Sequence, residues 1–274
     1  MAGSSLGYCV QHFGKESEWI TQEGISSKMS KISDYRQTLH TLDDWIPFLK
    51  KESGLPGPRG NLELAHAVAQ EGNQKQFEQL LSFEAKENTP EVFLVFCGVM
   101  GLGKLVSNEP KLFERLRSYA SDPRWRIRES VATGLQLVGD QDMPLLLKEM
   151  QKWSKGNWYE KRAVAAALSE PRLLKQSKHV KQVLKILDEI TASMQEADNS
   201  KEEAFKVLRR GMGYCWSVSV AALPEAGKPL MEKWQKSQDG MIRWIMKENL
   251  KKNRLVKMDA KWVNACNAKL QSAA

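Results

Sequence analysis

Hydrophobic residues recur every three or four positions over most of the chain, which is the spacing of one face of an α-helix. Residues 179–194 are a clear example, because Val180, Val183, Leu184 and Leu187 follow this spacing. Residues 61–88 show the same pattern, while the sequence contains no alternating run typical of a strand and no Asn-Gly hairpin turn. The pattern therefore predicts an all-α protein.

Helix boundary signals agree with this periodicity. In Thr89-Pro90-Glu91, a capping residue is followed by a proline at the first helical position and an acid near the positive end of the helix dipole. Asp122-Pro123 repeats the arrangement. Because the gaps between the predicted helices are short, we expect successive helices to run antiparallel as hairpins.

Residues 97–106, CGVMGLGKLV, raise the alternative of a nucleotide-binding loop. From Gly98 onward they match G-x-x-x-x-G-K-[ST] except at the last position, where Leu105 replaces the hydroxyl residue. Such a loop needs a strand before it and a long helix after it. The preceding apolar run is instead spaced like a helix, so we predict one helix here, with Gly98, Gly101 and Gly103 allowing close packing, and no nucleotide site.

A degenerate repeat is visible when two distant segments are aligned. The segments SDPRWRIRESVATGLQLVG and KSQDGMIRWIMKENLKKNR match at Ile127-Arg128 and Ile242-Arg243. Their separation corresponds to three units of roughly 38 residues, a length typical of helical-hairpin repeats. We therefore expect a stack of hairpins.

The stretch D-P-x-x-x-I-R-E-x-V-A, which starts at Asp122, resembles the HEAT repeat of bacterial HEAT-like proteins. In HEAT arrays the Asp and Arg of this motif usually bind neighbouring turns, so the resemblance implies structural roles for Asp122 and Arg128. The wider chain also resembles an uncharacterised bacterial HEAT-repeat family, through residues 55–65, 213–229 and 243–255.

These resemblances imply a right-handed superhelical solenoid of HEAT-like helical hairpins. We expect the HEAT-like repeat domain to span residues 55–274. Residues 1–54 would then form an N-terminal helical cap segment, because a solenoid needs a polar outer face at each end.

Composition limits the chemistry that the chain can perform. The four cysteines form no C-x-x-C pair, and the four histidines lack H-E-x-x-H spacing. We therefore predict free thiols, no metal site, no cofactor and no catalytic residue. The sequence shows no secretory signal and no apolar run long enough to span a membrane, which favours a cytoplasmic protein without a membrane partner.

Charge and tryptophan content suggest binding instead. Lys and Arg total 41 against 33 Asp and Glu, giving a formal net charge of +8, and several of the nine tryptophans stand beside basic residues. Such pairs suit base stacking with phosphate neutralisation, and they equally suit cation–π contacts between repeats. The candidate ligand-binding residues are Arg59, Trp125, Arg126, Trp158, Lys161, Arg162, Arg209, Trp216, Arg243 and Lys247.

We expect a non-catalytic binding scaffold whose concave face recognises a protein or a nucleic-acid backbone; the sequence leaves the oligomeric state open. The alternative is DNA repair, because NWYEKRAVAAAL is similar to a segment of the HEAT-like glycosylases that remove alkylated bases. In that segment a Trp precedes an Arg by four positions, as Trp158 precedes Arg162. Those enzymes also use an Asp after paired tryptophans, and this sequence contains no such pattern.

Overall fold

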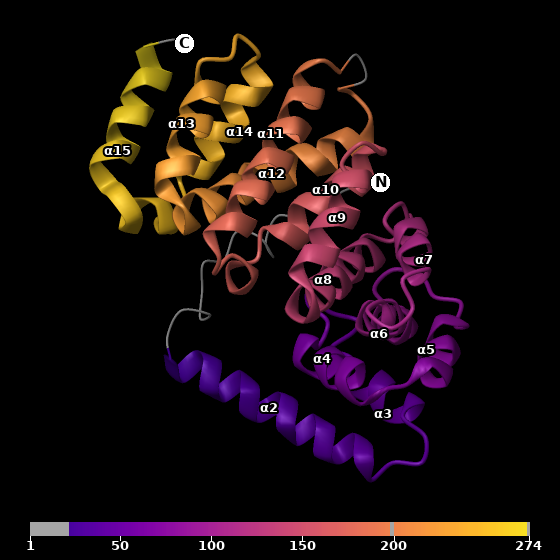
Figure 1. Cartoon of the computed structure of the whole chain (residues 1–274). Coiled ribbons are helices and arrows are strands. Elements are labelled where there is room, and N and C mark those ends of the chain that lie inside the picture. The colour runs from indigo at the N-terminus through magenta and orange to yellow at the C-terminus, as the bar shows by residue number, and fades with distance from the viewer. Residues whose placement is uncertain (1–21, 198–199, 273–274) are drawn as a thin grey trace. The chain divides into compact units, whose positions relative to one another are not determined.

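The computed structural model describes residues 22–197 and 200–272, which are drawn as coloured ribbon in Figure 1. These residues form fourteen α-helices and one short 3-10 helix, and none of them lies in a strand. The predicted all-α class is confirmed. The described residues divide into two compact units, one ending at Gln141 and the other starting at Asp142.

The first unit contains seven helices. They are α2 (Gln22–His40), α3 (Ile46–Lys51), α4 (Leu62–Glu71), α5 (Gln74–Leu81), α6 (Pro90–Leu105), α7 (Leu112–Tyr119) and α8 (Trp125–Gln141). Helices α4, α6 and α8 pack side by side, α5 and α7 pack against α6, and α2 packs along α4. The unit is therefore built from closely packed helices, while their predicted arrangement as antiparallel hairpins stays a prediction.

Local capping explains where several of these helices begin. Asn61 accepts a hydrogen bond from the backbone N–H of Leu64 at the start of α4. Asn73 forms a reciprocal capping box with Gln76 at the start of α5. Helix α6 starts at Pro90, as predicted, but the side chain of Thr89 makes no capping hydrogen bond and its hydroxyl donates to the Lys86 carbonyl oxygen instead. Helix α8 does not start at the predicted Asp122-Pro123 but at Trp125.

The glycines of α6 allow close approach to its neighbours. A Cβ atom on Gly103 would lie 2.3 Å from the carbonyl oxygen of Gly134 in α8. A Cβ atom on Gly101 would lie 2.3 Å from the ring of Phe77 in α5. Both distances are far below ordinary van der Waals contact, so only glycine fits at these positions. Because residues 90–105 form one continuous helix, the predicted helix is confirmed and the phosphate-loop geometry is absent from this stretch.

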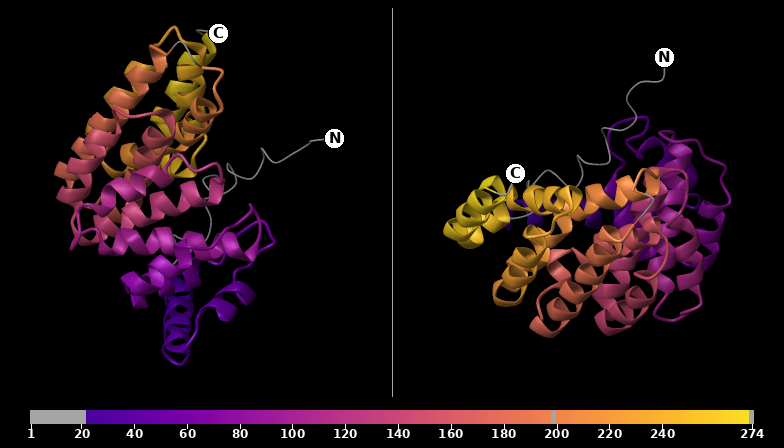
Figure 2. Two further views of the ribbon diagram at one scale, coloured as in Figure 1. Left: turned by 90° about the vertical axis from the view of Figure 1, so that its right-hand side faces the viewer. Right: turned by 90° about the horizontal axis from the view of Figure 1, so that it is seen from above.

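The second unit has the same construction. Its elements are α9 (Met143–Trp153), α10 (Trp158–Leu168), the 3-10 helix η1 (Pro171–Leu173), α11 (Ser177–Gln195), α12 (Glu203–Ala222), α13 (Pro224–Gln235), α14 (Gly240–Leu250) and α15 (Asn253–Ser272). Helices α10, α12 and α14 form one layer, while α9, α11, α13 and α15 pack against each other in a second layer (Figure 2). Trp153, Phe205 and Trp216 are completely buried between the layers.

The predicted boundary between residues 54 and 55 stays a prediction. In the structure α2, which belongs to the predicted cap segment, packs on α4 of the predicted repeat domain. Tyr35 of α2 accepts a hydrogen bond from the Asn61 side chain, and Leu39 is buried in the core of the first unit. Helix α2 is thus an integral part of that unit.

No helix among the described residues is long and apolar enough to cross a membrane. Within the same residues, no three His, Cys, Asp or Glu side chains gather closely enough to hold a metal ion. Cys97, Cys215 and Cys266 are buried free thiols. Burial raises the pKa of the Cys97 thiol well above its ordinary value, so this sulfur stays protonated and unreactive.

Candidate binding face

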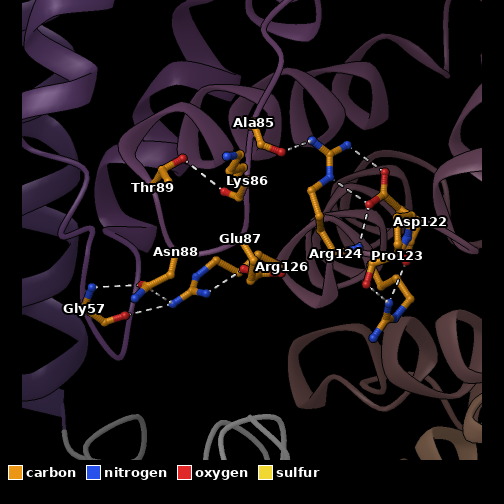
Figure 3. Close-up of polar contacts among 11 residues, drawn as sticks. Gly57, Ala85, Lys86, Glu87, Asn88, Thr89, Asp122, Pro123, Arg124 and Arg126 are labelled. Atoms are coloured by element: carbon orange, nitrogen blue, oxygen red, sulfur yellow. Dashed lines mark hydrogen bonds and ion pairs between the residues drawn. The ribbon is translucent and has the colours of Figure 1, made fainter. Parts of the chain in front are cut away.

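Asp122 and Arg128 hold the turn that precedes α8. One terminal guanidinium nitrogen of Arg128 donates to the carbonyl oxygens of Asp122, at 2.6 Å, and Pro123, at 2.9 Å. The Asp122 carboxylate accepts from both the backbone and the guanidinium of Arg124 (Figure 3). Arg128 is only 8% exposed. These side chains therefore stabilise a turn within the first unit.

Arg243 makes the same contacts at the start of α14 in the second unit. Its guanidinium donates to the carbonyl oxygens of Ser237, at 3.0 Å, and Gln238, at 3.1 Å. These acceptors stand six and five residues before Arg243, as Asp122 and Pro123 do before Arg128. The aligned arginines thus have equivalent roles, and the interpretation of Arg243 as a ligand-binding residue does not fit this backbone-bound guanidinium.

Arg126 joins the start of α8 to two turns of the first unit. Its guanidinium donates to the Glu87 carboxylate at 2.6 Å, to the Gly57 carbonyl oxygen at 2.8 Å and to the Asn88 side chain at 3.2 Å (Figure 3). The same guanidinium lies 4.3 Å above the ring of Trp125. Arg126 is 7% exposed. The Trp125–Arg126 pair therefore connects parts of the first unit. Its guanidinium is enclosed by its hydrogen-bond partners, so a ligand cannot reach it.

Arg59 stays accessible at the edge of the first unit. Its side chain is 43% exposed and forms a long 3.5 Å ion pair with Glu63. It borders an open hollow of about 310 Å³ to which Lys31, Tyr35 and Glu52 also contribute. Because the hollow mixes two cations with two carboxylates, its charges favour no single class of ligand.

Trp158, Lys161 and Arg162 are packing residues of the second unit. The Lys161 amine donates to the Ser193 hydroxyl at 3.0 Å and lies 4.3 Å above the Trp158 ring. Trp158 also packs edge-to-face on Phe205, with ring centroids 5.1 Å apart. Lys161 is 8% exposed and Arg162 is 3% exposed. Burial lowers the pKa of the Lys161 amine. Neither cation is placed to meet a phosphate group in solution.

Trp216 is a core residue. It is 0% exposed, and its indole N–H donates to the Thr191 hydroxyl at 3.1 Å. An aromatic side chain enclosed in this way cannot stack on a ligand, so the ligand-binding interpretation of Trp216 is not supported by its position. Its burial between α11 and α12 comes from tertiary packing, which the basic residues next to it in the sequence do not reveal.

Arg209, Trp244 and Lys247 come together on two neighbouring helices of the second unit. The Arg209 guanidinium of α12 lies 4.3 Å above the Trp244 ring of α14. Lys247 follows Trp244 by one turn and is exposed. Lys206 precedes Arg209 by one turn and is exposed too. We call Lys206, Arg209, Trp244 and Lys247 the α12–α14 face.

Sequence reasoning missed part of this face. The candidate residues included Arg209 but not Trp244, whereas the structure places the Arg209 guanidinium over the Trp244 ring. Lys206 was missed, although its three-residue spacing from Arg209 places both on one side of a helix. The packing of α12 against α14 brings these residues together, and no local pattern encodes that packing.

The cations of the α12–α14 face lack acidic partners. Among the described residues, no ion pair includes Lys206, Arg209 or Lys247. Nearby cations differ, because Arg210 pairs with Glu203 and Lys251 pairs with Glu248. The face therefore presents three uncompensated positive charges around one half-buried indole ring.

Comparisons with known proteins give little similarity. No protein-family model and no curated protein sequence matches the chain. Among solved structures, the chain is similar to an engineered protein crystallised by the Northeast Structural Genomics Consortium, with 12% identity and a TM-score of 0.35. That match covers 83% of this chain and 97% of the engineered protein. A similarity of this level assigns neither the fold nor the function of the chain.

Proposed function

We propose that the protein is a non-catalytic scaffold of HEAT-like helical hairpins that binds the backbone of nucleic acids through its α12–α14 face. The observation that carries the proposal is the set of three uncompensated cations, Lys206, Arg209 and Lys247, around Trp244. Neutralising phosphates with Lys and Arg releases counterions and supplies affinity independent of sequence. The net charge of +8 assists the approach of a polyanion.

The HEAT-like part of the proposal rests on the equivalent arginines and on the layered hairpins. Arg128 and Arg243 bind the two carbonyl groups five and six residues before them, in different units. We propose that the hairpins continue as a right-handed superhelix whose concave side carries the α12–α14 face. The buried free thiols of Cys97 and Cys215 fit a reducing compartment such as the cytoplasm.

The glycosylase alternative has less support. Trp158 and Arg162, which carry the resemblance to the repair enzymes, are occupied in packing within the second unit. Glu248, one turn along α14 from Trp244, forms an ion pair with Lys251. Base excision needs a carboxylate to stabilise the developing positive charge on the sugar. The α12–α14 face therefore supports binding without catalysis.

Fluorescence anisotropy with labelled 20-nucleotide single strands and duplexes of two unrelated sequences, at about 50 mM salt, tests this proposal. The wild-type chain is expected to bind both sequences equally well. The double variant Lys206→Glu/Lys247→Glu is expected to weaken binding roughly tenfold or more on every sequence, since two phosphate contacts become repulsive.

The matched control is Lys75→Glu/Lys181→Glu, which makes the same charge reversal at two exposed lysines that form no ion pair among the described residues. Its affinity should stay within about twofold of the wild type, because long-range charge effects are screened by salt. If the wild-type chain binds no nucleic acid at low salt, the proposal is wrong and a protein partner takes its place.

A further inference from the structure

We infer that the α12–α14 face selects single-stranded nucleic acid by stacking one unpaired base on the Arg209–Trp244 pair. This inference rests on the proposed function and names its substrate class. Arg209 lies 4.3 Å above the Trp244 ring, and both side chains are half-buried, so the pair forms a small two-layer platform at the surface.

The indole N–H of Trp244, like that of Trp125, has no hydrogen-bond partner among the described residues. Five other indoles of the described residues donate a hydrogen bond within the protein; they belong to Trp45, Trp153, Trp216, Trp234 and Trp262. Trp244 is only half-buried, so its indole edge can be met by water or by a ligand.

The Trp125–Arg126 pair of the first unit shows what a purely structural pair looks like. Its stacking distance is also 4.3 Å, but Arg126 is held by three hydrogen-bond partners and is 7% exposed. Arg209 has the Trp244 ring as its contact and no ion pair among the described residues. The Trp244 ring lies against one side of the half-buried guanidinium, and a base would stack on the other side.

The two lysines flank the stacked pair on opposite sides. Helices α12 and α14 run parallel, because Arg209 contacts Trp244, Gly213 lies beside Glu248 and Ser217 bonds to Asn249. Lys206 is therefore one turn before the pair and Lys247 is one turn after it. From the helical rise and a typical distance between helix axes, their Cα atoms lie about 13 Å apart. Two long side chains at this spacing can meet the phosphates on either side of one nucleotide.

Stacking requires a base whose planar surface is exposed. Bases of a duplex expose only their edges in the grooves, whereas bases of a single strand expose their faces. Arginine guanidinium planes and aromatic rings are the groups on which proteins stack unpaired bases. A base, the Arg209 guanidinium and the Trp244 indole would thus form one three-layer stack, with Lys206 and Lys247 as phosphate contacts.

The conservative variant Arg209→Lys tests the inference, because it keeps the charge and removes the plane. We would measure its binding by anisotropy with labelled 12-nucleotide oligo(dT) and oligo(U) and a 12-base-pair duplex. Loss of one stacked base is expected to weaken single-strand binding roughly 5- to 150-fold. Duplex binding should change by less than about twofold, since the phosphate contacts remain. Comparing the affinities for oligo(dT) and oligo(U) shows whether the protein prefers DNA or RNA.

Arg210→Lys is the matched control, because Arg210 is the adjacent arginine on α12 and pairs with Glu203. It should leave single-strand binding unchanged, and thermal unfolding should show that both variants are folded. The inference is overturned if Arg209→Lys binds single strands like the wild type, or if the wild type prefers the duplex. Either result would leave the proposed function intact. Absence of binding to all three probes would contradict both the proposed function and the inference of base stacking.

Discussion

At the scale of single residues, the surroundings of a cation decide whether it holds the fold or remains available to a ligand. Arg126 and Arg128 are nearly buried and donate to carbonyl or carboxylate groups of adjacent turns. Lys161 is buried against Trp158 and Ser193. Arg209 and Lys247 lack such partners among the described residues and face outward. The sequence alone does not separate the two groups, because a basic residue near a tryptophan has the same local pattern whether it is buried or at the surface.

Replacing Arg128 with alanine should destabilise the protein. The carbonyl groups of Asp122 and Pro123 would lose the hydrogen bonds from a guanidinium that is nearly buried, which costs about 1–3 kcal/mol of unfolding free energy. Urea unfolding followed by circular dichroism measures this loss. Lys75→Ala, at an exposed site, should stay within about 0.5 kcal/mol of the wild type. An Arg128→Ala chain as stable as this control would show that the arginine does not support the turn.

At the scale of helices, the sequence predicted where a helix lies better than which other helices it packs against. The run from Pro90 to Leu105 was predicted as one helix with glycines for close packing, and this helix is confirmed. The glycine of α8 that meets it, Gly134, could not be predicted, because helical periodicity shows that a face is buried but not which helix covers it. The pairing of Arg209 with Trp244 was missed for the same reason.

Gly103→Ala should destabilise the contact between α6 and α8. The added methyl group would lie 2.3 Å from the carbonyl oxygen of Gly134, so the two backbones must move apart. Overpacking of this kind costs about 1–3 kcal/mol, and more where backbone blocks the new atom. A differential scanning calorimetry trace should show a lower unfolding temperature.

Gly240→Ala is the control for that change. Gly240 begins α14, and a Cβ atom there would meet nothing within 4 Å. Alanine also restricts the unfolded chain more than glycine does, so this variant should unfold at the wild-type temperature or slightly above it. Equal effects of the two substitutions would contradict a close approach of α6 and α8 at Gly103.

At the scale of the whole molecule, composition and periodicity were enough for the all-α class. They were not enough for the division after Gln141, since the turn GDQDMP at residues 139–144 resembles the other short connections between helices. The binding face was found only in part. Arg209 and Lys247 were among the predicted residues, whereas Lys206 was absent and Arg243 proved to bind backbone carbonyls.

The central claim is that Lys206 and Lys247 contact phosphates, and the salt dependence of binding tests it most directly. The logarithm of the association constant for a single strand should fall linearly with the logarithm of salt concentration. In Lys206→Ala/Lys247→Ala the magnitude of that slope should be smaller by about 1.4, because two phosphate contacts are lost. Lys75→Ala/Lys181→Ala should keep the wild-type slope. If Lys206→Ala/Lys247→Ala shows the same slope as the wild type, the account is contradicted.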